Sequence, residues 1–314
     1  MIPLVVAFRR LPPNVQGAAW LVSGGFIFTS TGVMIRLLSE QVESVQTAFF
    51  RAILSLLMLL PWILSGRVQP WASKRIAGHF WRTFAGTASM VLGFYAVSML
   101  PLGDATAIAF SQPLFSVVVA AAIAGEKVRW RRWTATIVGF VGVLIMVRPG
   151  AGSLQLGALV ALANAAMVAF SILLVKRLSD SETPLMILTQ FAIFSTMLLL
   201  PPALWVWRWP DLWGWTLAIG IASTATVGQY FWVQAFKAGE MSAVAPFEYL
   251  RLPFAVFLGW LIWGETPVVW TYVGAAIVIA SALYIAHREQ KLARERRKAE
   301  LRPPPTPPPV QPAS

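Results

Sequence analysis

Long apolar runs separated by short turns dominate this chain, and they restrict its fold more than any other feature. Because the hydrocarbon core of a bilayer is ~30 Å thick, a helix that crosses it needs about 20 apolar residues. Ten such runs occupy residues 17–37, 47–64, 80–99, 104–124, 132–148, 156–175, 184–205, 213–236, 242–263 and 267–286. The sequence therefore predicts an all-α integral membrane protein with ten transmembrane helices.

The composition agrees with this prediction. Hydrophobic residues make up 57% of the chain and charged residues only 12%, with a mean hydropathy of +0.67, whereas about 25% of the residues in a soluble domain are charged. The first apolar stretch precedes Arg9 and Arg10 and lacks a small-residue cleavage site, so we do not expect a signal peptide.

The distribution of basic residues predicts the orientation. Lys and Arg in short loops are retained in the cytoplasm, and most of the 25 fall on one side when residues 1–16 and 287–314 are both placed there. The net charge of +12 is then explained by orientation and by contact with anionic lipids. Because these charges are scattered over several loops, we do not expect nucleic-acid binding. We expect a multi-pass protein of a bacterial-type inner membrane.

Residues 287–314 form a basic tail that ends in the proline-rich run PPPTPPPVQPAS. This run cannot hold a helix, and we expect a disordered, polyproline-like end. It is either a solvated end or a ligand for an aromatic-lined partner domain.

Residue types that carry metal or covalent chemistry are scarce. The chain has no cysteine, and its two histidines, His79 and His287, lie among basic residues. We therefore expect no metal site and no cofactor. The sequence contains no His-rich cluster, no carboxylate pair and no nucleophile beside a base, so we do not expect an enzyme.

The two halves of the chain resemble each other. Residues 17–39 align without gaps with residues 157–179. Each half holds five expected spans, an odd number, so the second half must enter the membrane in the opposite orientation. The sequence thus predicts two inverted five-helix repeats, residues 17–148 and 156–286, an arrangement typical of secondary transporters.

The fourth and ninth spans share a further pattern. Each contains a central proline, Pro113 or Pro253, and each ends in Gly-Glu, at Glu126 and Glu265. The helices that follow carry small residues at equivalent positions, which allow close helix packing in lipid: Ala135 and Gly142 in the first half, Gly274 and Ser281 in the second. Over residues 15–288 the chain resembles the EamA-type permeases of the drug/metabolite transporter superfamily.

The resemblance implies ten helices, cytoplasmic termini and an inner cavity that opens alternately to either side. Members of the superfamily move amino acids, nucleoside-like metabolites, vitamins and other small polar compounds, often as exporters. We expect the Gly-Glu pairs to be structural.

Two charges interrupt the ninth span, and they are the leading candidates for a binding site. Glu248 and Arg251 lie three residues apart on one helix face, and an unpaired ion at that depth costs at least ~2.5–3.5 kcal/mol. Arg251 is expected to bind an anionic group of the substrate, and Glu248 to orient Arg251 or to carry a coupled proton. The alternative is a structural pair that joins the ninth helix to its neighbours.

Other polar residues inside the spans are weaker candidates. Arg51 is expected either to contact substrate or to extend to the interface as an anchor. The remaining candidates for substrate contact share hydrogen-bonding or stacking groups: Tyr95, Ser111, Gln112, Asn164, Gln190, Gln229, Tyr230 and Trp232. For each one, an interhelical hydrogen bond is the alternative.

We therefore expect an inner-membrane secondary transporter that moves a small polar metabolite by alternating access. An amino acid or related carboxylate is the expected substrate, and efflux the expected direction. Uptake of a vitamin or nucleoside-type metabolite is one alternative, and a non-transporting structural or signalling subunit is another. The sequence does not determine the oligomeric state, and a homodimer is one expectation.

Overall fold

The computed structural model describes residues 11–66, 69–70, 73, 75–123, 130–148, 154–179, 181–239 and 244–300, and every regular element in them is a helix. In chain order these are α2 (Pro13–Leu38), α3 (Ser44–Leu64), α4 (Ile76–Met99), α5 (Leu102–Ala109), α6 (Gln112–Ile123), α7 (Trp130–Val147), α8 (Leu154–Ser179), α9 (Pro184–Trp205), α10 (Leu212–Ala238), the 3₁₀ helix η2 (Ala245–Leu250), α12 (Arg251–Trp263) and α13 (Val269–Glu300). Residues 301–314, which include the whole proline-rich run, and Glu126 lie outside the described residues.

Seven helical stretches within the described residues are long and apolar enough to cross a membrane, which confirms the prediction of a helical membrane protein. These stretches are Pro13–Leu38, Ser44–Pro61, Leu102–Ile123, Trp130–Val147, Leu156–Leu178, Leu185–Trp205 and Val269–Arg288. Two further helices, α4 and α10, have 24 and 27 residues but are not among the seven. Both are rich in glycine, threonine and aromatic residues with polar groups, which lower their mean hydropathy.

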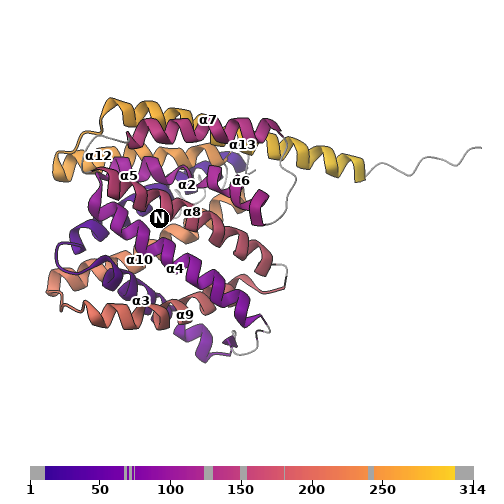
Figure 1. The fold of residues 1–314 in the computed structure, drawn as a ribbon. Coiled ribbons are helices and arrows are strands. Elements are labelled where there is room, and N and C mark those ends of the chain that lie inside the picture. Colours follow the sequence, from indigo (N-terminus) through magenta and orange to yellow (C-terminus); the bar gives the residue numbers. More distant parts are fainter. Residues whose placement is uncertain are drawn as a thin grey trace, which may run out of the picture.

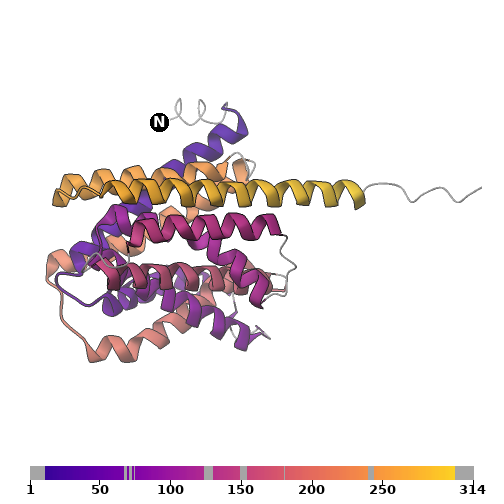
Figure 2. The same cartoon turned by 45° about the horizontal axis from the view of Figure 1, so that its top comes forward.

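The helices form a layered bundle (Figure 1). The layer of α7 and α13 lies along one edge and the pair of α3 and α9 along the opposite edge, with α2, α4, α8 and α10 between them. Within this middle layer, α2 packs mainly against α10 and α4 mainly against α8. Figure 2 shows that α13 continues past the end of the bundle, so the basic segment after residue 286 prolongs the last helix.

Most of the buried apolar residues fall in two groups of helices. One cluster is formed by the end of α4 with α5, α6, α7, α8, α12 and α13, and the other by α2, α3, α4, α9 and α10. Glycine brings α7 and α13 together, because a Cβ atom added at Gly142 would lie 2.9 Å from the carbonyl oxygen of Gly274. The small residues expected on this face thus pack at a helix–helix contact.

The ranges expected for the fourth and ninth spans are not continuous α-helices. The fourth is divided into α5 and α6 at Phe110 and Ser111, and the ninth begins as η2 before α12 starts at Arg251. Pro113 and Pro253 lie in the first turns of α6 and α12, where a missing backbone N–H breaks no intrahelical bond. Both halves therefore have a helix break just before a proline.

Candidate functional site

The two helix breaks meet inside the bundle. Phe110, at the end of α5, and Tyr249, in η2, have ring centroids 4.9 Å apart and rings inclined at 79°. This edge-to-face contact joins segments that belong to different halves of the chain. Discontinuous helices that meet between two halves form the substrate sites of many secondary transporters, so we take this junction as the candidate site.

Arg251 supplies the positive charge at this junction. Its guanidinium carbon lies 5.5 Å from the centroid of the Phe28 ring of α2. Gly25, one turn earlier on α2, makes room for it, because an added Cβ atom would lie 2.9 Å from Arg251 Cγ. The Nε atom of Arg251 is buried and has no hydrogen-bond partner in the structure. A partly buried cation with an unused donor is therefore held against an aromatic ring.

Glu248 lies in η2, three residues before Arg251, and is half-buried. The two side chains attract each other electrostatically, but they form no ion pair within 4.0 Å. Residues three apart lie on the same face of a 3₁₀ helix, so η2 agrees with the prediction that Glu248 and Arg251 share a helix face. Because no direct bridge forms, Glu248 does not occupy the guanidinium donors of Arg251.

Ser111 and Gln112 lie at the first break, and both make local hydrogen bonds. Ser111 is buried, and its hydroxyl donates to the carbonyl oxygen of Ile108 at 2.7 Å. The side-chain amide of Gln112 donates to Ser116 Oγ at 2.8 Å. These residues shape the break, and in this state their polar groups are engaged within their own segment.

Three other candidates make interhelical contacts. The Tyr95 hydroxyl lies 3.4 Å from Glu43 Oε2 in a hydrogen bond. The Asn164 amide lies against Gly93 of α4, 3.3 Å from the position of an added Cβ. Gln190 is buried and donates to the carbonyl oxygen of Pro70. Tyr95 and Gln190 thus have hydrogen-bond partners within the bundle and Asn164 packs against α4, and all three remain predicted contacts of the substrate.

Gln229, Tyr230 and Trp232 are exposed on α10. Tyr230 accepts a hydrogen bond from the side-chain amide of Gln234 at 2.8 Å, and its ring contacts Trp20 of α2 at a centroid distance of 6.4 Å. The structure therefore places these three residues on the exposed side of the α2–α10 pair.

Arg51 and Arg82 come together in another part of the bundle. Arg51 of α3 is partly buried and donates to Met90 Sδ of α4 at 2.6 Å, so its side chain points into the protein and does not extend to the interface. The guanidinium of Arg82 lies over the Phe191 ring of α9, 3.9 Å from its centroid. The sequence placed Arg82 near the cytoplasmic side but did not indicate that it is buried, because its burial depends on packing against α9.

Polar contacts join the helices at both ends of the bundle. Arg36, near the end of α2, forms an ion pair of 2.5 Å with Glu265, which also accepts from the Leu102 N–H at 3.2 Å. At the opposite end, Glu182 accepts from Ser73 Oγ at 2.6 Å and lies 3.7 Å from His79 Nε2. These contacts agree with a structural role for Glu265.

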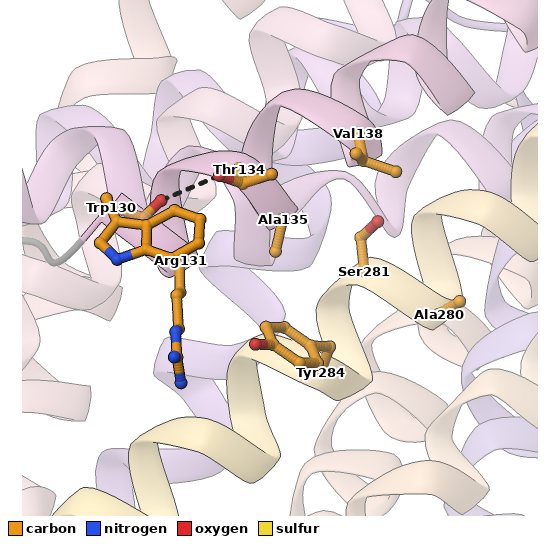
Figure 3. Close-up of a pocket in the computed structure, with 8 residues that line it drawn as sticks. All are labelled: Trp130, Arg131, Thr134, Ala135, Val138, Ala280, Ser281 and Tyr284. Atoms are coloured by element: carbon orange, nitrogen blue, oxygen red, sulfur yellow. Dashed lines mark hydrogen bonds between the residues drawn. The ribbon is translucent and has the colours of Figure 1, made fainter.

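A groove of about 420 Å³ lies between α7 and α13, at the edge of the bundle (Figure 3). Exposed Trp130 and Tyr284 line it, together with Arg131, whose guanidinium carbon is 5.5 Å from the Trp130 ring centroid. Thr134 Oγ1 donates to the Trp130 carbonyl oxygen at 3.1 Å, within the same helix. An aromatic and basic surface of this kind is typical of a membrane interface, and it is separate from the helix breaks.

Comparisons with known proteins agree with this architecture. The chain is 28% identical over 281 residues to an S-adenosylmethionine uptake transporter of Rickettsia prowazekii, covering 90% of this chain and 96% of the relative. It is 28% identical over 290 residues to a riboflavin transporter of Vibrio cholerae, covering 90% and 97%. It is also 25% identical over 285 residues to the pseudopaline exporter CntI of Pseudomonas aeruginosa, covering 88% and 97%.

A solved crystal structure shares the fold with a TM-score of 0.58 at 16% identity, covering 90% of this chain and 99% of the other. The relatives are transporters and not enzymes, and with the apolar helices they indicate a multi-pass protein of the bacterial inner membrane. The model of the EamA-like transporter family matches residues 15–148 and again residues 155–286. The chain therefore belongs to the EamA-like transporter family.

Proposed function

We propose that this protein is a secondary transporter that binds a small polar metabolite where its two helix breaks meet and moves it by alternating access. The observation that carries the proposal is Arg251, a partly buried cation whose Nε has no partner. Ionisable groups inside a membrane bundle are costly and commonly mark a substrate pathway. The Phe28 ring lies beside this charge, and the Phe110 and Tyr249 rings contact each other at the helix breaks.

The proposal includes ten spans arranged as two inverted repeats, residues 17–148 and 156–286, with both termini in the cytoplasm. Two features support it. In the two repeats, α2 corresponds to α8 and α10 corresponds to α4. The α2–α10 pair therefore corresponds to the α8–α4 pair, and both pairs pack extensively. The same correspondence relates the α5–α6 break to the η2–α12 break.

The proposed substrate carries a carboxylate, as an amino acid or related compound does. The planar fork of arginine matches a carboxylate with two parallel hydrogen bonds, and the aromatic rings at the helix breaks favour a solute with a flat apolar part. A vitamin or nucleoside-type solute is the second candidate, favoured by relatives named for riboflavin and S-adenosylmethionine transport. Export remains our prediction, since the relatives' names include both uptake and export.

Glu248 is the proposed proton carrier. It is half-buried in η2, close enough to Arg251 to interact with it but without a direct ion pair. Replacing it by glutamine should remove the dependence of transport on a pH gradient while leaving exchange of substrate at equal pH intact. Unchanged dependence of the flux on the gradient would exclude Glu248 as the carrier.

The experiment that tests the proposed site is ligand-induced thermal stabilisation of the purified protein. A ligand that binds only the folded state raises its stability by mass action. We expect a compound with a carboxylate, from a panel of amino acids, organic acids, nucleosides and vitamins, to stabilise the wild type and not Arg251→Gln. A compound that stabilises both proteins equally would move the site elsewhere. Contact with anionic lipids and a homodimer remain proposals.

A further inference from the structure

Arg51 and Arg82 form a second centre of positive charge in the bundle. Their guanidinium groups are close enough to repel each other. Neither forms an ion pair within 4.0 Å with a carboxylate of the described residues. Two like charges held together in a partly buried region destabilise the protein unless something neutralises them.

Several donors of these two residues lack a strong acceptor. Arg82 Nε and Nη1 are buried and have no hydrogen-bond partner, and Arg51 donates to the thioether of Met90, which is a weak acceptor. Contact with the Phe191 ring orients the Arg82 guanidinium without occupying its in-plane N–H groups. Both residues are only partly buried as a whole, although the two unpartnered nitrogens of Arg82 are themselves buried.

The neighbouring residues add small and hydroxyl groups. Gly86, one turn after Arg82, lets the Phe191 ring approach α4 closely, because an added Cβ atom would lie 2.9 Å from Phe191 Cε2 and 3.4 Å from Arg82 Nη1. The hydroxyls of Thr83 and Thr87 on α4 are buried and have no hydrogen-bond partner. Residues 82, 83, 86 and 87 recur at the spacing of one helix face. A face with unused donors is suited to a ligand that only accepts hydrogen bonds.

We infer that Arg51 and Arg82 bind a small anionic group, a carboxylate or a phosphate, between α3, α4 and α9. Two arginines can each direct a pair of N–H groups at the oxygens of such a group, and the anion neutralises the repulsion between them. This site is separate from the helix breaks, because Arg51 and Arg82 contact α4 and α9 whereas Arg251 contacts α2. The inference therefore holds whether or not Arg251 binds substrate.

The test measures the melting temperature of the purified full-length protein as sodium acetate or sodium phosphate is added. The wild type should show a saturable rise. The apparent Kd should increase roughly tenfold to a hundredfold in Arg82→Gln and in Arg51→Gln, the loss expected for one charge-assisted hydrogen bond. Arg82→Lys should keep part of the response. Arg131→Gln removes an exposed charge of α7 and should respond as the wild type does.

A second readout separates an anion site from a purely structural arginine. Without added anion, Arg82→Gln should melt at a higher temperature than the wild type, because the repulsion with Arg51 is gone. If Arg82 only joins α4 to Phe191, the same variant should melt at a lower temperature. A lower melting temperature together with an anion response equal to that of the wild type would overturn the inference.

The source of the anionic group is decided by comparing probes. Stabilisation by acetate or phosphate that survives in Arg251→Gln indicates a site for a free anion. If neither salt acts, but a carboxylate compound of the solute panel needs both Arg82 and Arg251, the site takes the acidic group of the solute itself. If Arg82→Gln responds to every probe as the wild type does, no anion binds between these arginines.

Discussion

Replacing Gly25 by alanine should weaken substrate binding by displacing Arg251. The added methyl carbon would lie 2.9 Å from Arg251 Cγ, whereas carbon atoms in contact are about 3.5–4.0 Å apart, so the side chain must move by about 1 Å. Overpacking of this kind costs about 1–3 kcal/mol. Arg251 has to return to its original position to bind the substrate, and binding must then overcome this overpacking free energy. The Kd of the substrate should therefore rise roughly 5- to 150-fold.

The assay is a titration of the stabilising compound against purified Gly25→Ala, with melting temperature as the readout. Gly32→Ala is the matched control, because it makes the same change on the same helix and meets only the flexible end of Leu102, at 3.1 Å. The control should bind as the wild type does. A Kd within about twofold of the wild type in a folded Gly25→Ala protein would refute the placement of substrate at Arg251.

Three further predictions concern the rest of the bundle. Glu265→Gln should lower the free energy of unfolding by about 1.5–3 kcal/mol, because it removes a charged partner of Arg36. The double variant with Arg36→Gln should lose little more stability than either single variant. Additive losses in thermal unfolding would show that the pair does not act as a unit. Gly142→Val should destabilise the protein by about 1–3 kcal/mol, because its Cβ would lie 2.9 Å from the carbonyl oxygen of Gly274. The control Val141→Ala, on the exposed side of α7, should not destabilise it. Equal melting temperatures for both variants would contradict the tight α7–α13 contact. Deleting residues 301–314 should leave substrate flux in proteoliposomes unchanged, and loss of flux would favour a role for the proline-rich end.

The membrane-spanning helices could be predicted from the sequence, because they depend on the match between apolar residues and the hydrocarbon of the bilayer. Apolar runs of about 20 residues have to lie in hydrocarbon as helices, and seven helical stretches meet that criterion in the structure. Pro113 and Pro253 marked the two interrupted spans, because proline removes a backbone donor. Hydropathy could not separate α5 from α6 or identify η2, because it measures how apolar a segment is and not its backbone conformation.

The candidate site was only partly predictable. Arg251 and Glu248 stood out as charges in an apolar span, but Phe28 and Gly25, which hold the guanidinium, are ordinary residues of a membrane helix. Their role comes from the packing of α2 against α12. Arg82 was missed for a related reason, because a charge near the start of a span normally points to water, and only the contact with Phe191 shows that it points inward.

The central claim is that Arg251 at the helix breaks binds the transported solute. The most direct measurement is counterflow of the radiolabelled stabilising compound in proteoliposomes that contain equal amounts of wild type, Arg251→Gln, Arg251→Lys or the surface variant Arg131→Gln. The account predicts counterflow for the wild type and Arg131→Gln, none for Arg251→Gln, and a weaker signal with a raised half-saturation concentration for Arg251→Lys, which keeps the charge but loses the fork. Counterflow by Arg251→Gln at the wild-type rate and half-saturation would contradict it.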